Sequence, residues 1–160
     1  LKKGSQIITK AAHDISGDVL VIQMGSNGGW NDYDELIEQY KAMIANSGTE
    51  CYIIIGDTDN PEESVDSANY TSSQEVGTGD TMWEAALREA FGEHFVNMRT
   101  YLLENALNIA GLEPTQMDEE DLSQGRVPET IKYDYTHLNS YGYYAIGYGV
   151  YEKGLELGYW

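Results

Sequence analysis

The chain has 160 residues, of which 41% are hydrophobic, and a formal net charge of −18 at neutral pH. This length and composition favour one globular domain over residues 1–160 and exclude a disordered chain. The acidity argues against nucleic acid or an anionic membrane as a partner, because both attract basic surfaces. No segment approaches the roughly 18 apolar residues of a membrane span, and the single cysteine, Cys51, excludes an intrachain disulfide.

The first half of the chain alternates between helix and strand patterns. Residues 5–13 are expected to form a short helix. Residues 18–24 are nearly all apolar, which is typical of a strand buried on both faces. A helix is expected over residues 31–45, with Asn31 or Asp32 as its N-cap, followed by a second buried strand over residues 51–55.

The second half begins with a long polar segment, residues 58–78, which is expected to be a loop. Asp80 or Thr81 is expected to cap a helix that Gly92 ends, and a short strand is expected over residues 94–98. Further helices are expected over residues 100–110 and 138–158, with an acidic loop over residues 112–132 between them. Four glycines, Gly142, Gly147, Gly149 and Gly154, weaken the last helix by propensity and suggest close packing on the sheet.

Alternation of short apolar strands with helices predicts an α/β sandwich with a parallel sheet. In such folds, ligands bind beyond the carboxyl ends of the strands. Gly25-Ser26-Asn27 follows the first predicted strand, and Asp134 and His137 follow the last predicted strand after a helix and a loop. Both landmarks are therefore expected at the same edge of the sheet.

The spacing of Asp134 and His137 suits an oriented general base. A carboxylate three residues before a histidine can accept the Nδ1 proton, which fixes the tautomer and leaves Nε2 free to take a proton. The spacing alone is common, and a glycine-asparagine turn after a strand is also ordinary turn chemistry. The two landmarks gain force because they occur together.

These residues resemble the SGNH hydrolases, or GDSL-type esterases. Gly25-Ser26-Asn27 is similar to the Gly-x-Asn block of that family, and Asp134-Tyr135-Thr136-His137 to its Asp-x-x-His block. Gly28 follows Asn27, as in SGNH domains linked to O-acetylation and deacetylation of polysaccharide or peptidoglycan. The resemblance spans about residues 18–160. It implies a three-layer α/β/α sandwich of flavodoxin-like type and a secreted or cell-surface bacterial protein, although the chain shows no signal-peptide segment.

The resemblance also implies roles for individual residues. His137 would be the general base, Asp134 would orient it, and the Asn27 amide would donate to the oxyanion. Gly25, Ser26, Trp30 and Tyr135 would lie at the substrate, a small acyl ester or acetylated carbohydrate. No cofactor is implied. No metal site is expected either, since the acids Asp57, Asp59, Glu62 and Glu63 lack the spacing of a calcium loop.

One block of the family is absent from this sequence. The family nucleophile lies in a Gly-Asp-Ser block, whereas Ser16-Gly17-Asp18 has another order and precedes a strand. The fold's N-terminal strands and the nucleophile are therefore expected outside this chain. Residues 19–24, with Val19 and Met24 at their ends, are too apolar for an exposed edge. A missing N-terminal segment or a second chain is expected to pair with them.

Two alternatives to a serine esterase or carbohydrate deacetylase stay open. The first is a non-catalytic SGNH-like domain that binds carbohydrate or has a structural role, at a cell surface or in a phage particle. The aromatic residues near the motifs would suit sugar stacking, although packing is the more common use of such residues: Trp30, Tyr133, Tyr135, Tyr141 and Tyr143. The second is a flavodoxin-like binding domain in which the motifs are accidental. That alternative predicts a phosphate-binding glycine loop, and residues 25–29 lack the usual spacing.

Overall fold

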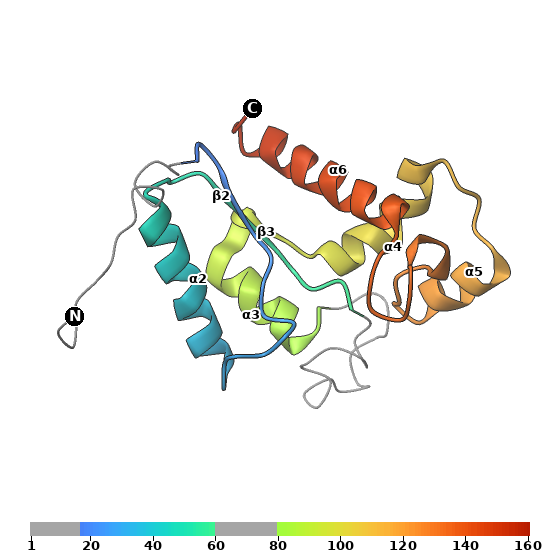
Figure 1. Ribbon diagram of the computed structural model, residues 1–160, viewed down its shortest axis with the longest axis horizontal. Coiled ribbons are helices and arrows are strands. Elements are labelled where there is room, and N and C mark those ends of the chain that lie inside the picture. Colours follow the sequence, from blue (N-terminus) through green and yellow to red (C-terminus); the bar gives the residue numbers. More distant parts are fainter. Residues whose placement is uncertain (1–16, 60–79) are drawn as a thin grey trace, which may run out of the picture.

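A computed structural model describes residues 17–59 and 80–160 of the chain (Figure 1). The helix predicted over residues 5–13 and most of the loop predicted over residues 58–78 lie outside the described residues. Three strands, β1 (Leu20–Ile22), β2 (Tyr52–Ile55) and β3 (Phe95–Val96), form a sheet in the order β1-β2-β3. All neighbours are parallel, with Val21 opposite Ile53 and Ile54 opposite Phe95. The predicted α/β class with a parallel sheet is confirmed.

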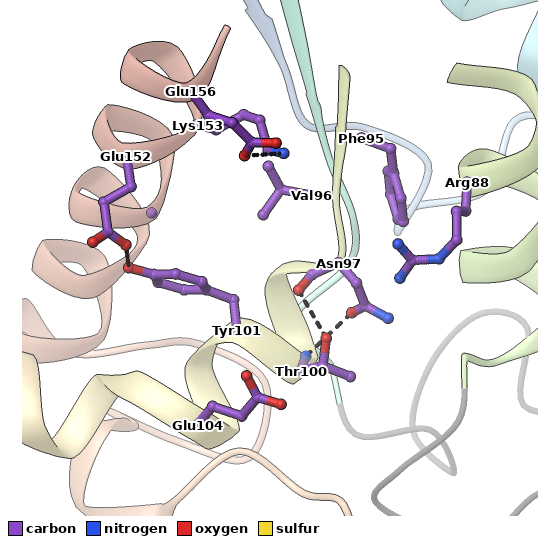
Figure 2. Close-up of a pocket in the computed structure, with 11 residues that line it drawn as sticks. Arg88, Phe95, Val96, Asn97, Thr100, Tyr101, Glu104, Glu152, Lys153 and Glu156 are labelled. Carbon is purple, nitrogen blue, oxygen red and sulfur yellow. Dashed lines mark hydrogen bonds and ion pairs between the residues drawn. The ribbon is translucent and has the colours of Figure 1, made fainter. Parts of the chain in front are cut away.

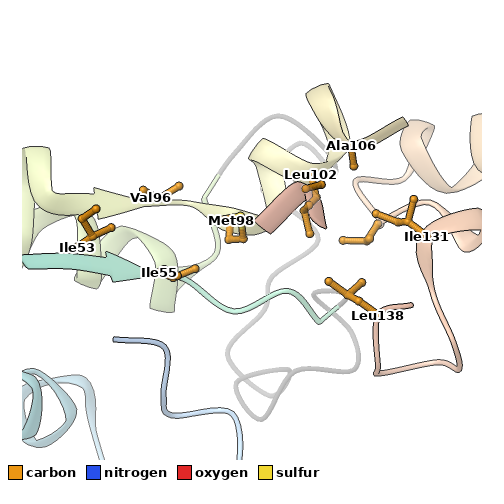
Figure 3. Close-up of a cluster of buried hydrophobic side chains, with 10 residues drawn as sticks. Ile53, Ile55, Val96, Met98, Leu102, Ala106, Ile131 and Leu138 are labelled. Carbon is orange, nitrogen blue, oxygen red and sulfur yellow. The ribbon is translucent and has the colours of Figure 1, made fainter. Parts of the chain in front are cut away.

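The central strand β2 contributes to two hydrophobic clusters because its side chains alternate between the faces of the sheet. Ile54 packs with Ile22 of β1 and with residues of α2 (Tyr33–Ser47) and α3 (Met82–Phe91). Ile53 and Ile55 belong instead to a cluster with residues of α4 (Met98–Ala110), labelled in Figure 3, and with Ala145 of α6 (Ser140–Glu156). Helices therefore cover both faces of the sheet (Figure 1).

Local capping explains where the helices on the first face begin and end. The side chain of Asp32 accepts a hydrogen bond from the Glu35 N–H at 2.8 Å, and Gly48 ends α2 at a φ of 73° that favours glycine. Thr81 and Glu84 form a reciprocal capping box at the start of α3. After Gly92, a 3₁₀ turn, η2 (Gly92–His94), leads into β3.

On the second face, α4 and α6 approach closely through glycine. A Cβ atom on Gly149 would lie 2.7 Å from the Tyr101 ring, and a Cβ on Gly142 would lie 2.7 Å from the Ile131 carbonyl oxygen. These two glycines do pack closely, but against α4 and η3 (Glu129–Ile131) and not on the sheet as expected. Gly147 has no neighbour within 4 Å and does not share this role.

The acidic loop predicted over residues 112–132 was wrong in part. It contains α5 (Gln116–Ser123) and the 3₁₀ turn η3 (Glu129–Ile131). A helix with so few apolar residues gives no clear hydrophobic period, but its capping box, Thr115 with Asp118, was visible in the sequence. Asp118 is completely buried and accepts hydrogen bonds from Thr130 as well as Thr115, so polar contacts hold this segment.

Several boundaries also differ from the prediction. The first strand, expected over residues 18–24 and buried on both faces, shortens to Leu20–Ile22, and Val21 is 42% exposed. Helix α4 begins at Met98, capped by Asn97, so the predicted strand over residues 94–98 shortens to two residues. Helix α6 begins at Ser140, capped by Asn139, and His137 therefore precedes the helix. Among the described residues, no helix has the length and apolar character needed to span a membrane.

Candidate active site

Both sequence landmarks line one cleft beyond the carboxyl ends of β1 and β2. The cleft has a volume of about 200 Å³ and is lined by Ser26 and Asn27 on one side and by Thr136 and His137 on another. Asp57, which follows β2, also lines the cleft. The parallel sheet thus brings together residues that lie more than a hundred positions apart in the sequence.

The Asp134–His137 pair has the geometry of an oriented base. His137 Nδ1 lies 2.9 Å from both carboxylate oxygens of Asp134. The backbone N–H of His137 donates to Oδ1 at 2.7 Å, and that of Thr136 donates at 3.0 Å. These hydrogen bonds, first that from the His137 N–H and then that from its side chain, hold the pKa of Asp134 below its usual value. An ionised Asp134 favours the proton on Nδ1, which leaves Nε2 as the acceptor.

The loop that carries the pair is fixed at both ends. The Tyr133 N–H donates to the His137 carbonyl at 2.7 Å, and Lys132 forms an antiparallel bridge with Leu138, a buried residue. The Asn139 side chain donates to the Lys132 carbonyl at 3.1 Å and also caps α6. The position of His137 is therefore set by the start of α6 and not by the loop alone.

On the other side of the cleft, Tyr40 of α2 fixes the backbone just before the Gly25 turn. The Tyr40 hydroxyl donates to the Met24 carbonyl at 2.7 Å and accepts from the Met24 N–H at 3.3 Å. Burial raises the pKa of Tyr40 to about 12, so this donor stays protonated. Gly25 has a φ of 112°, and a Cβ there would lie 2.6 Å from the Trp83 ring. Glycine is thus required at this position on two grounds.

Ser26 links the ends of β1 and β2 across the cleft. Its hydroxyl donates to Asp57 Oδ1 at 3.0 Å, and the same oxygen accepts the Thr58 N–H at 2.8 Å. In the sequence, Asp57 is one of four clustered acids that lack the spacing of a calcium loop, and its place in the cleft was not predicted. Its place directly after β2 was the signal that could have found it, because this is where ligands meet a parallel sheet.

The predicted site residues divide into two groups. Ser26, Asn27 and His137 line the cleft, and Asp134 contacts His137. Trp30 does not line the cleft: its indole N–H donates to the Gly25 carbonyl at 3.0 Å and its ring packs near Trp83. Tyr135 is 74% exposed and also lies outside the lining.

The charges in the cleft favour neutral or cationic ligands, since Asp57, Asp59 and Asp134 accompany one histidine. Within residues 17–59 and 80–160, no group of three His, Cys, Asp or Glu side chains could hold a metal ion. Glu62 and Glu63 of the acidic cluster fall outside the described residues.

A larger cavity, of about 320 Å³, lies beside β3 (Figure 2). Most of its charged side chains have partners: Lys153 binds Glu156 at 2.6 Å, Tyr101 donates to Glu152 at 2.6 Å, and Arg88 binds Asp80, which does not line the cavity. It holds no histidine. The smaller cleft, with an oriented base and amide donor, is the better candidate for catalysis.

No protein-family model, curated protein or solved structure matches this chain.

Proposed function

We propose that this chain carries the base and oxyanion side of a serine-type ester hydrolase of SGNH type. Its substrates would be small acyl esters, in particular O-acetyl groups on carbohydrate or a cell-wall polymer. The observation that carries the proposal is the Asp134–His137 pair, with Nδ1 at 2.9 Å from the carboxylate, in the same cleft as Asn27.

In this mechanism His137 Nε2 removes the proton from a serine hydroxyl as its oxygen attacks the acyl carbonyl carbon. The Asn27 amide donates to the resulting oxyanion. His137 then returns the proton to the departing alcohol oxygen as the ester C–O bond breaks. Water, deprotonated by His137, attacks the acyl-serine that remains and forms a second tetrahedral intermediate. The bond between its acyl carbon and the serine oxygen then breaks, His137 returns the proton to that oxygen, and the acid is released.

The proposal places the nucleophile in a segment beyond this chain, because the sequence has no Gly-Asp-Ser block. That segment would pair with β1 and complete a three-layer α/β/α sandwich. Two observations support it: β1 stands at one end of the described strand order, and Val21 at its centre is 42% exposed. An open apolar strand of this kind is a template for another strand.

The test is turnover of p-nitrophenyl acetate by this chain, and by a natural polypeptide extended upstream to any Gly-Asp-Ser segment. We expect activity in the extended form and a loss of about 10²–10⁴-fold in its His137→Ala variant. Asn27→Ala should cost about 10²–10³-fold. Tyr133→Phe, at a tyrosine outside the cleft lining, is the matched control.

Activity that survives His137→Ala would refute the assignment of the base. Activity in the 160-residue chain alone would instead point to Ser26, which lines the cleft but donates its hydroxyl to Asp57. Ser26→Ala would then abolish it. Labelling by a fluorophosphonate, followed by peptide mapping, identifies the reactive serine in either case.

A second candidate is a non-catalytic domain of the same type that binds carbohydrate. Two observations favour it. The Ser26 hydroxyl donates to Asp57 and not to His137, as that of a nucleophile would, and α6 exposes several tyrosines that suit sugar stacking. Absence of turnover in both forms, together with measurable glycan binding, would select it over the esterase.

A further inference from the structure

A pocket of about 340 Å³ lies between α4 and α6 and shares no residue with the cleft. Tyr101, Asn105 and Asn108 line it from α4, and Tyr144, Tyr148 and Glu152 line it from α6. We call these six residues, together with Ile109 of α4, the α4–α6 pocket. Its volume falls within the range of roughly 300–1,000 Å³ that is usual for small-molecule sites.

Aromatic rings extend from this pocket along α6. Tyr144 and Tyr148 are 59% and 40% exposed, so their rings are open to a ligand. Tyr151 continues the row, with its ring centroid 6.3 Å from that of Tyr148, and Trp160 lies stacked 6.4 Å beyond it. A row of exposed rings offers successive stacking positions to an extended ligand.

Hydrogen-bonding groups lie beside these rings. Tyr101 donates to Glu152 at 2.6 Å (Figure 2), and the Asn105 amide nitrogen donates to the Tyr101 carbonyl at 2.9 Å. Within the described part of the chain, no hydrogen bond uses the Asn108 side-chain amide. The pocket therefore presents carboxylate and amide acceptors and an amide donor next to aromatic faces.

This combination fits one ligand chemistry. The C–H face of a sugar ring is apolar and packs against the electron-rich face of a tyrosine, while its hydroxyls both donate and accept. An anionic ligand would meet Glu152 and a chain of net charge −18. A protein partner that buried these rings would also desolvate the Glu152 carboxylate, which is costly without a matching cation.

We propose that the α4–α6 pocket and the adjoining aromatic row bind an uncharged oligosaccharide. The inference does not rest on the Asp134–His137 chemistry, because the two sites have no residue in common. If both proposals hold, the pocket would retain a glycan polymer while the cleft removes its acyl groups.

The test is isothermal titration calorimetry of the full chain with cellohexaose, xylohexaose and chitohexaose, and with oligogalacturonate as an anionic comparison. We expect binding of at least one neutral hexasaccharide and none of oligogalacturonate. The double variant Tyr144→Ala/Tyr148→Ala should weaken binding about tenfold or more. Tyr144→Phe/Tyr148→Phe keeps the rings and should retain most of the affinity.

Three controls keep the result specific. His137→Ala must bind as the parent does, which separates this site from the cleft. Tyr133→Ala removes an exposed tyrosine outside the pocket and should leave affinity unchanged. Circular dichroism and melting temperature check that the double variant is folded. No binding to any neutral glycan, equal loss in Tyr133→Ala, or a tyrosine-dependent dimer in sedimentation would each overturn the proposal.

Discussion

Two carboxylates in this molecule pair with a nitrogen-bearing side chain at similar distances but in opposite surroundings. Glu84 and Arg99 form a two-point ion pair at 2.7 Å, with 4% and 2% of their side chains exposed. Arg99 also donates to the Gly125 carbonyl at 3.0 Å, and Glu84 accepts the Thr81 N–H. Asp134 and His137 lie 2.9 Å apart with 39% and 68% exposed.

The difference separates a structural role from a chemical one. Loss of a partner in the buried pair would leave a charge without solvent, so that pair holds α3, α4 and the turn at Gly125 in place. The exposed pair is kept in position by backbone N–H groups of its own loop. Loss of its histidine would therefore leave no buried charge without a partner.

The largest expected effect comes from Glu84→Gln. The substitution keeps the shape of the side chain but leaves the Arg99 charge buried and uncompensated, which should reduce the free energy of unfolding by about 3–5 kcal/mol. Urea denaturation followed by circular dichroism measures it. Arg88→Gln, in the exposed pair with Asp80, is the matched control and should cost at most about 1 kcal/mol. An equal loss of unfolding free energy in the two variants would show that burial of the Glu84–Arg99 pair makes no difference.

A smaller effect is expected at Asp118. Burial alone would raise its pKa, but hydrogen bonds from Thr130 and Thr115 prevail and lower the pKa from 3.8 to about 2. The unfolded chain therefore takes up the proton first as pH falls. This carboxylate should contribute about 2 kcal/mol above pH 4, and the contribution should disappear as pH falls towards 2.

The measurement is urea denaturation of the parent chain and Asp118→Asn across this pH range. The stability difference between them should be largest near neutral pH and should shrink from about pH 4 downwards, because the asparagine does not titrate. A difference that stays constant down to pH 2 would show that the charge of Asp118 contributes nothing.

Tyr40→Phe should have an effect of about 1 kcal/mol, since it removes one buried hydroxyl that serves two backbone groups of Met24. Hydrogen exchange should quicken at the amides that follow Met24, because the Gly25 turn loses its support. Unchanged exchange there, with stability reduced, would limit Tyr40 to a packing role.

The smallest effect is expected for His137→Ala, which should leave the urea midpoint within error of the parent chain. The pair is exposed, and the loop retains its Tyr133–His137 backbone bond and the Asn139 cap. A loss as large as that of Tyr40→Phe would assign the histidine a structural role and weaken the catalytic proposal.

Apolar runs and capping residues were sufficient to predict most of the described fold from the sequence. The strands around Val21 and Ile53 and the ends of α2 at Asp32 and Gly48 are local signals. Helix α5 was not predicted because it is held by Asp118, whose hydrogen-bond partner Thr130 is twelve residues away. A pattern search for apolar period does not detect such contacts.

The candidate site, like the fold, could be predicted where the signal was local in the sequence. Asn27, Asp134 and His137 belong to short motifs that can be read directly, and the cleft contains Asn27 and His137. Trp30 and Gly25 were assigned to the substrate, whereas the structure places them in contact with each other through a hydrogen bond. The hydrogen bonds of Asp57 and Tyr40 join residues 31 and 16 positions apart and could not be read from spacing, although the place of Asp57 just after β2 did indicate the cleft.

The alternating isoleucines of β2 have a consequence for how the chain unfolds. Ile54 belongs to the cluster under α2 and α3, and Ile53 and Ile55 belong to the cluster under α4 and α6. One four-residue strand thus contributes side chains to both clusters, so neither cluster can unfold without disturbing the other. The described residues should therefore melt in a single cooperative transition, with equal midpoints for probes placed on α2 and on α6.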